Sequence, residues 1–298
     1  PLADPEMYDW FRQREPDAVI AGALHYYHIT AGETRVDWVA QCVTPTVPLD
    51  GAAVADGFGR ADMRQIAFDC AQSWIFPDDP AGVFVLHGAW LADSRAARLH
   101  VTAPGIKDPF ITRRLEMADL GYQQRAYRDM PAFALYRAAA VITPPSTPAW
   151  IAPAETAPAQ LISLAPSPSP QPLEGPLAFL GLTVEHNAAD LDIVTWWKVT
   201  DAPEPRPVSI FAHLLTAEGV SLGGADGLGI PMEYWQPGDI LVQRHTFRLS
   251  QGQIESAVIL RTGVYGLDDG RRWAVASGTV GADAFFVPLY TRVPEPMR

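Results

Sequence analysis

A proline-rich stretch in the middle of the chain constrains the fold more than any other feature. Ten prolines lie between residues 144 and 176. Proline fixes φ and has no backbone N–H, so such a stretch suits neither a regular helix nor the interior of a sheet. We therefore expect residues 143–175 to form an extended linker with polyproline character between two domains. The length of 298 residues also favours two domains rather than one.

Strand-like segments dominate the chain after this stretch. Runs rich in β-branched and aromatic residues follow one another, with turn residues between them and no amphipathic helical pattern. They are LAFLGLTVE, LDIVTWWKVT, VSIFAHLLTAEG, DILVQRHTFRL, SAVILRTGVYG and RRWAVASGTV. This pattern predicts an antiparallel β-sandwich over residues 176–298, immunoglobulin-like or jelly-roll-like in its arrangement.

The first 142 residues mix helical and strand patterns. Helices are expected at residues 4–15, where Asp4 and Pro5 suit a helix start, and at residues 108–121. The run AVIAGALHYYHI is apolar enough for either a buried strand or a helix, and periodicity does not decide between them. Further strands are expected in VDWVAQCVTP, RQIAFDCAQSWIF, GVFVLHGAWL and AFALYRAAAV, whereas DGFGRAD is expected to form a turn. Residues 1–142 are thus predicted to be a small α/β domain, and the whole chain to be α+β.

Charge and hydropathy limit the partners that this chain can take. The formal net charge is -12, from 34 acidic and 22 basic residues. A surface of this sign repels a phosphate backbone, so nucleic acid is not an expected partner. No apolar run reaches the roughly 18 to 20 residues that a membrane-spanning helix needs, so no membrane-spanning segment is expected within these residues.

The two cysteines, Cys42 and Cys70, have neither partner cysteines nor histidines at the spacing of a zinc site. Each lies in a strand-like run. Neighbouring strands would allow a disulfide between them in an oxidising compartment. The alternative is a pair of buried thiols.

Few residues suggest a catalytic or metal site. The chain contains no GxSxG elbow, Walker loop or HExxH motif. Most of its carboxylates are expected at turns. Asp226, in the glycine-rich run GGADGLGIP, could contribute to a Ca²⁺ site, and no other cofactor is expected.

Aromatic residues supply the candidate binding site. Trp196 and Trp197 are consecutive in a predicted strand, so their rings should point to opposite faces. One exposed ring together with Tyr234 and Trp235 would form a stacking platform for sugar rings. The alternative is that all four rings pack in the core or between domains.

The run EYWQPGDILVQRHTFRLSQGQ, residues 233–253, joins these aromatics to a turn and a strand. Pro237 and Gly238 are typical of a tight turn. In the following strand the alternation of side chains predicts that His245 faces the core with its hydrogen bonds satisfied. Trp235 is then expected to cap one end of the sandwich. We interpret this run mainly as scaffold, and only secondarily as a sugar platform.

The β-rich half resembles the C-terminal extracytoplasmic region of a class of bacterial membrane glycosyltransferases. These enzymes are of the dolichyl-phosphate-mannose mannosyltransferase type and use polyprenyl-phosphate sugars as donors. The resemblance spans residues 177–276, and the first domain is only loosely similar to the small α/β region that precedes the sandwich in those enzymes. The matching positions are Trp196 and Trp197, Phe211 with His213 to Leu215, Trp235 with Pro237 and Gly238, Arg244 with His245, and Gly263 with Tyr265 and Arg272.

This resemblance implies an extracytoplasmic location, periplasmic or at the cell surface. Association with the membrane would come through a segment outside these residues or through a partner. In that family the catalytic acidic residues lie in a loop after the first membrane helix, which these 298 residues do not contain. No catalytic residue carries over, so the chain by itself is not expected to be a glycosyltransferase.

Three functions follow as hypotheses. The leading one is a non-catalytic module that positions a glycan or protein acceptor. The alternative is a stand-alone secreted or periplasmic structural subunit of a cell-surface or membrane complex, which acts through protein contacts. The third is a soluble glycoside-active enzyme, which requires two carboxylates facing each other across a groove.

Overall fold

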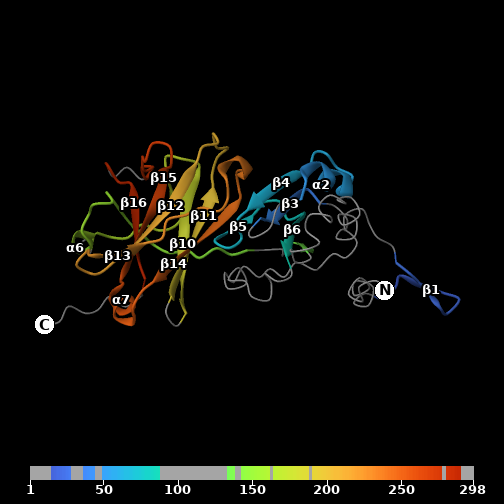
Figure 1. The fold of residues 1–298 in the computed structure, drawn as a ribbon, viewed down its shortest axis with the longest axis horizontal. Coiled ribbons are helices and arrows are strands. Elements are labelled where there is room, and N and C mark those ends of the chain that lie inside the picture. The colour runs from blue at the N-terminus through green and yellow to red at the C-terminus, as the bar shows by residue number, and fades with distance from the viewer. Residues whose placement is uncertain are drawn as a thin grey trace. The chain divides into compact units, whose positions relative to one another are not determined.

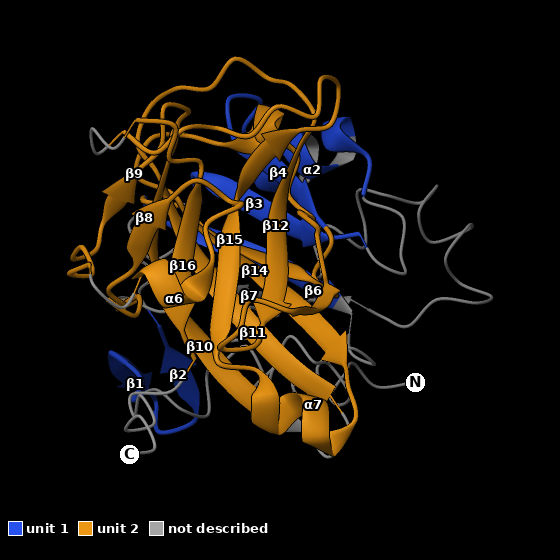
Figure 2. Cartoon of the chain, turned by 90° about the vertical axis from the view of Figure 1, so that its left-hand side faces the viewer, with its two compact units in different colours: residues 1–68, 79–141 blue, residues 69–78, 142–298 orange. Residues whose placement is uncertain are grey.

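Figure 1 shows the computed structural model of the chain, which is mostly β with predominantly antiparallel sheets. The predicted β-rich fold is confirmed at this level. The chain divides into two compact units, one of residues 1–68 and 79–141 and the other of residues 69–78 and 142–298 (Figure 2). The structure describes residues 15–27, 36–43, 49–87, 133–137, 142–161, 164–187, 190–276 and 280–289. The helices expected at residues 4–15 and 108–121 lie, apart from Glu15, outside these ranges.

The first unit contains a four-stranded mixed sheet. Its central strand β3 is buried along its whole length and pairs in parallel with both β4 and β6, while β7 pairs antiparallel with β6. A strand buried on both faces is expected to be apolar throughout, as this one largely is. In spatial order the strands are β4 (Arg64–Phe68), β3 (Trp38–Cys42), β6 (Gly82–His87) and β7 (Phe133–Arg137).

Helix α2 (Gly51–Phe58) connects β3 to β4. The Asp50 carboxylate accepts a hydrogen bond from the Ala52 N–H at 3.0 Å and so satisfies one of the free donors at the helix start. Gly59 follows the helix with φ +66°, a left-handed conformation common after a helix C-terminus. The turn expected in DGFGRAD is therefore observed only over residues 59–62, because the first three residues of the run complete α2. Val54 of this helix packs with Val39 of β3 in the core of the unit.

A short hairpin forms near the start of the described chain. Strands β1 (Ala18–Ile20) and β2 (Leu24–Tyr26) pair antiparallel around a turn in which Ala21 and Gly22 both have positive φ. Two consecutive positive φ values match the turn type that suits the twist of a tight hairpin. The strand alternative for this run is thus observed, although in strands of three residues that are exposed throughout.

The second unit contains two five-stranded sheets in which every neighbouring pair is antiparallel. The first sheet has, in spatial order, β5 (Ser73–Phe76), β14 (Ile240–Arg248), β11 (Asp190–Val199), β10 (Leu177–Asn187) and β9 (Gln171–Pro172). The second has β13 (Ser221–Gly224), β12 (Val208–Leu215), β15 (Ile259–Gly266), β16 (Ala284–Pro288) and β8 (Trp150–Ala152).

Aromatic rings join the two sheets in the core of this unit. Phe285 of β16 lies 5.1 Å, centroid to centroid, from Phe179 of β10 and 6.1 Å from Trp197 of β11. Phe179 and Trp197 meet edge to face at 5.1 Å. All three side chains are fully buried. Each such ring removes a large apolar area from water, so this cluster is a main source of the unit's stability.

The proline-rich stretch is more than the extended linker that the sequence predicts, because it contributes two strands to the sheets. Its strands β8 and β9 each occupy an outer position, one in each sheet. Proline lacks a donor for one side of a ladder and is therefore tolerated at a sheet edge, where that side is unpaired. The short helix α6 (Pro158–Leu161) lies between the two strands. The first compact unit ends at residue 141, next to the predicted domain end at residue 142, and residues 142–175 belong to the second unit rather than lying between two domains.

The run RQIAFDCAQSWIF forms two strands rather than one, and these belong to different sheets. Asp69 ends β4 because its carboxylate accepts a hydrogen bond from the Ala71 N–H at 3.0 Å, and its carbonyl accepts one from the Ser73 N–H. An aspartate that bonds the backbone two residues later is typical of a turn. After this turn, β5 pairs with β14 in the second unit.

Two short helical segments and one strand of the second unit differ from the sequence prediction. The 3₁₀ turn η3 (Met232–Tyr234) lies within the 233–253 run, and helix α7 (Gln251–Ser256) begins with a capping box between Ser250 and Gln253. Among its described residues, the predicted strand RRWAVASGTV makes only isolated bridges, at Arg272 and Val275. The observed last strand, β16, lies after it.

Cys42 and Cys70 are both disulfide-bonded, and because the chain has no other cysteine they are joined to each other. Of the two alternatives from sequence, the structure therefore has the bridge rather than the thiols.

In the part of the chain that the structure describes, no helix is both long and apolar enough to cross a membrane.

Candidate functional site

The tryptophans predicted to form a sugar platform lie in the core. Trp197 is 0% exposed, Trp235 3% and Trp196 7%. The indole N–H of Trp197 donates to Thr195 Oγ1 at 3.0 Å, and that of Trp235 donates to the Ile230 carbonyl at 3.1 Å. The structure therefore corrects the expectation of an exposed Trp surface: these rings pack internally, as the alternative interpretation held.

Trp196 and Tyr234 complete the predicted group. The Trp196 ring stacks on Phe76 at 6.3 Å, with an angle of 4° between the planes, and its Nε1 is buried without an acceptor among the described residues. Tyr234 is only partly buried, and burial followed by the neighbouring Glu233 charge raises its phenol pKa above the ordinary value. The four residues thus do not present a common aromatic face.

The turn at Pro237 and Gly238 is a structural corner. Gly238 has φ +96°, and a Cβ at this position would lie 2.7 Å from Asp78 Cγ, so glycine is required. The fully buried Asp239 accepts hydrogen bonds from the Gln236 N–H at 2.9 Å and the Asp78 N–H at 3.3 Å. These contacts connect the corner to the chain before and after it, in agreement with the scaffold interpretation of this run.

His245 is buried and satisfied on both ring nitrogens, as the alternation of its strand predicts. Its Nδ1 lies 2.6 Å from the Ala225 carbonyl and its Nε2 lies 3.0 Å from Thr195 Oγ1. Burial lowers the pKa of His245 to about 4, although the Ala225 carbonyl and Asp226 act in the opposite direction. At neutral pH the ring is therefore uncharged, and Nδ1 donates while Nε2 accepts.

Asp226, the candidate Ca²⁺ ligand, belongs to a hydrogen-bonded network on β12 and β15. Its Oδ1 lies 3.3 Å from His213 Nε2 and accepts the Ala212 N–H, and its Oδ2 accepts from the Tyr265 hydroxyl at 3.4 Å. Burial raises the pKa of the Asp226 carboxyl, but the bonds from His213 and Ala212 outweigh this and lower it overall. Among the described residues, no group of three or more His, Cys, Asp or Glu side chains could hold a metal ion.

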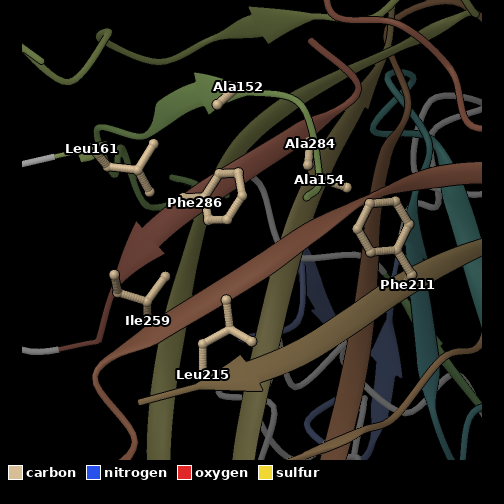
Figure 3. Packing of buried hydrophobic residues seen from close by; sticks show 8 residues of the cluster. All are labelled: Ala152, Ala154, Leu161, Phe211, Leu215, Ile259, Ala284 and Phe286. Carbon is tan, nitrogen blue, oxygen red and sulfur yellow. The ribbon is translucent and has the colours of Figure 1, made fainter. Parts of the chain in front are cut away.

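The same network ties the segment after β8 to the second sheet. Arg261 donates to His213 Nδ1 at 2.9 Å and to the Ala154 carbonyl at 2.5 Å, while Asp283 accepts the Ala154 N–H at 2.7 Å. An apolar cluster that includes Phe211 lies mainly on strands of the same sheet (Figure 3). The network is only partly buried, because the Asp226 side chain is 34% exposed and the His213 side chain 24%. The cluster residues drawn in Figure 3 are Ala152, Ala154, Leu161, Phe211, Leu215, Ile259, Ala284 and Phe286.

An open pocket of about 570 Å³ lies elsewhere on the second unit. Its walls come from residues 173–176, 200–204 and 271–273, together with Arg206 and Met232. Backbone hydrogen bonds hold these walls together: the Thr200 N–H donates to the Pro176 carbonyl at 3.0 Å, and the Glu174 N–H donates to the Ala274 carbonyl at 2.8 Å. The volume is within the range of small-molecule sites, roughly 300 to 1,000 Å³.

Trp273 supplies the aromatic wall of this pocket. Its ring packs against Gly175, where a Cβ would lie only 2.3 Å from Trp273 Cε3, so any larger residue would displace the ring. The Arg206 guanidinium lies 5.7 Å from the ring centroid, a cation–π arrangement, and 3.9 Å from Asp269. Within the described residues the Trp273 indole N–H has no acceptor, and it is not a buried unsatisfied group. It is thus free to donate to a ligand.

Charged side chains of both signs line the remaining walls. The acidic ones are Glu174, Asp201 and Glu204, and the basic ones are Arg206, Arg271 and Arg272. Carboxylates accept hydrogen bonds, guanidinium groups donate them, and an aromatic ring covers an apolar ligand face. Together these groups suit a small polyhydroxylated molecule.

Sequence analysis did not identify this pocket. Among the individual positions that match the resembled family, only Arg272 lines the pocket, and it has no assigned role there. The signal that could have indicated the pocket is Trp273 directly after two arginines, at the end of the turn GLDDGRR. The pocket walls are far apart in sequence, so the fold is needed to bring them together.

Comparisons with protein-family models and with curated proteins identify no relative from which a function could be inferred. No family model matches the chain, and no curated protein matches it. The chemistry of the pocket is therefore what indicates its ligand.

Proposed function

We propose that this chain is a non-catalytic extracytoplasmic module, similar to the soluble C-terminal region of a membrane glycosyltransferase, which positions a glycan or protein acceptor. In this proposal the first unit is a small α/β domain and the second an immunoglobulin-like or jelly-roll-like β-sandwich. The β3–α2–β4 connection with parallel strands supports the former. The two five-stranded antiparallel sheets that share an aromatic core support the latter.

The observation that carries the proposed binding role is the pocket beside Trp273. It combines an aromatic wall with hydrogen-bonding groups of both kinds, and its walls are joined by backbone hydrogen bonds. A preformed wall costs little conformational entropy when a ligand binds. Sugars offer hydroxyl groups for the charged side chains and for the indole N–H of Trp273, whose ring is only 7% exposed. A glycan is thus the acceptor that this pocket suits best.

The disulfide supports the proposed location. Disulfides persist in oxidising environments such as the periplasm and the cell surface, and they are rare in the reducing cytosol. The Cys42–Cys70 bridge therefore favours an extracytoplasmic compartment, periplasmic or at the cell surface.

Calorimetric titration with neutral oligosaccharides tests the binding role. A mannose tetramer and an N-acetylglucosamine tetramer would be titrated into the chain and into the double variant Glu204→Gln/Arg271→Gln. Both residues line the pocket, are exposed and pair with no charged group among the described residues, so the substitutions should leave the fold intact. We expect binding by the unmodified chain and a loss of roughly tenfold or more in the variant.

Glu255→Gln is the matched control, because Glu255 is an exposed carboxylate of α7 that does not line the pocket. Its affinity should equal that of the unmodified chain. Failure of every saccharide to bind, or equal binding by the pocket variant, would contradict the proposal. Release of shorter saccharides during incubation would instead support the glycoside-active hypothesis and contradict the non-catalytic role.

One observation favours the alternative function, a structural subunit that acts through protein contacts. The β1–β2 hairpin exposes Val19, Ile20, Leu24 and Tyr26, and apolar groups gathered at a surface are typical of interaction sites. Cross-linking of the native protein in its own membranes, compared with a Val19→Ser/Leu24→Ser variant, tests this function. A stoichiometric partner cross-linked through the hairpin and lost in the variant would support it. Identical cross-links in both proteins would count against it.

A further inference from the structure

The charges around the Trp273 pocket are not balanced once their existing partners are assigned. Arg206 is paired with Asp269, which does not line the pocket. Arg272 lies 3.0 Å from Glu155 and 3.6 Å from Asp283, which are also outside the lining. Two of the three lining arginines are therefore already neutralised by neighbours.

The acidic residues of the lining have no such partners. Within the described residues, Glu174 and Glu204 form no ion pair, and Asp201 only accepts the N–H of the next residue at 2.8 Å. Arg271 is the remaining guanidinium, and its side chain also forms no ion pair there. The pocket thus offers three carboxylates against one guanidinium that is available to a ligand.

We propose that the pocket prefers amino sugars, which are saccharides with a free ammonium group. Neutral saccharides should bind less tightly, and anionic saccharides least tightly. This inference rests on the proposed function and specifies the ligand class of the same pocket. The ammonium group donates to the unpaired carboxylates, while the hydroxyl groups meet Arg271 and the indole N–H of Trp273. A uronate or a sugar phosphate would add negative charge beside Glu174, Asp201 and Glu204.

The size of the preference follows from the exposure of these carboxylates. An exposed ion pair contributes about 0.2 to 1 kcal/mol, and each 1.4 kcal/mol is tenfold in affinity. With more than one carboxylate in reach, we expect an advantage of roughly threefold to tenfold for the amino sugar over its neutral N-acetylated analogue. Because salt screens such contacts, the advantage should shrink at high ionic strength.

Three tetrasaccharides test this preference by calorimetry at about pH 6, below the ordinary pKa of an amine. They are the glucosamine tetramer, the N-acetylglucosamine tetramer with the same linkages, and a galacturonate tetramer. We expect affinity to decrease in that order and the first difference to narrow as salt is added. Equal or weaker binding of the glucosamine tetramer relative to its N-acetylated analogue would overturn the inference.

Matched variants locate the effect. Glu174→Gln and Glu204→Gln should each weaken binding of the glucosamine tetramer more than binding of the neutral one, and Glu255→Gln should change neither. A preference that persists undiminished in the Glu174→Gln/Glu204→Gln double variant would place the ammonium elsewhere and contradict the inference. If neutral saccharides bind but the charge order is absent, only this inference fails. If no saccharide binds, the proposed function fails with it.

Discussion

Trp197 and Trp273 are both nearly inaccessible tryptophans of the second unit, yet their surroundings differ in kind. The Trp197 ring contacts Phe179 and Phe285, and its indole N–H is bonded to Thr195. The Trp273 ring lies beside a charged guanidinium in a pocket wall, and its indole N–H is unused among the described residues. The exposed fraction of a tryptophan therefore does not show whether its ring packs in the core or borders a binding pocket. What distinguishes them is whether the polar groups around the ring are already satisfied.

The same contrast extends to the charged groups of the two regions. In the core, Arg244 and Asp192 are paired at 2.8 Å, and Thr246 also donates to Asp192. At the pocket, Glu174, Glu204 and Arg271 are left for a ligand or water. Substitutions in the first region should therefore change stability, and those in the second should change binding.

Trp197→Ala should give the largest loss of stability. Removing a fully buried indole from the centre of the sheet packing costs about 3 to 5 kcal/mol, from lost apolar burial and the cavity left behind. Denaturant unfolding of the variant and the unmodified chain measures this difference. A loss below about 1 kcal/mol would show that the site collapses around the missing ring and that Trp197 is not a main support of the core.

Breaking the buried Asp192–Arg244 pair should cost a comparable or slightly smaller amount. Asp192→Ala leaves the Arg244 guanidinium buried and unpaired, at about 3 to 5 kcal/mol, whereas Asp192→Leu/Arg244→Met replaces both charges by apolar groups. The double variant should therefore be clearly more stable than the single one. Equal destabilisation of the two variants, measured by thermal and denaturant unfolding, would contradict an intact buried pair.

Acid should weaken the core through His245. Its pKa of about 4 in the folded chain lies below the ordinary 6.5, so the unfolded chain binds the proton more tightly. This contribution to stability is complete above pH 6.5 and is lost as the pH falls towards 4, by about 3 kcal/mol. His245→Gln, which cannot gain this proton, should lack that part of the pH dependence in unfolding free energies measured across the interval. The same slope in both proteins would show that His245 is not buried in its neutral form.

Arg206→Gln should have the smallest effect on stability. An exposed cation–π contact with an exposed ion pair contributes at most about 1 kcal/mol, but the Arg206 guanidinium, although paired with Asp269, holds the Trp273 ring in the pocket wall. We expect saccharide affinity to fall several-fold while the midpoint of unfolding shifts little. If unfolding shifts as much as in Trp197→Ala, the Trp273 wall is part of the core and the contrast between the two regions disappears.

Strand positions in the second half of the chain were largely predictable, because alternation and turn residues mark them locally. The inward position of His245 followed from the same alternation. The edge positions of β8 and β9 could not be predicted from the sequence. Proline excludes a segment only from the interior of a sheet, and which sheet edge the segment joins depends on the strands that lie beside it. The break at Asp69 depends on a single side-chain hydrogen bond, which a strand pattern does not reveal.

The site was less predictable than the fold. Trp235 and Trp273 both follow turn-like runs, and no local pattern shows that one ring donates to Ile230 while the other borders a pocket. The balance of charge at the pocket depends on Glu155, Asp269 and Asp283, which neutralise arginines from outside it. Such pairing is a property of the folded chain.

The most direct measurement is an NMR titration that follows the tryptophan indole N–H signals while the N-acetylglucosamine tetramer is added. Our account predicts that the Trp273 signal moves with saturable, concentration-dependent shifts, while those of Trp197 and Trp235 stay where they are. Assignment would come from the Trp273→Phe variant, in which one indole signal disappears. Shifts in the Trp235 or Trp197 signals with a stationary Trp273 signal would contradict the account, because the saccharide would then bind near those rings rather than in the Trp273 pocket.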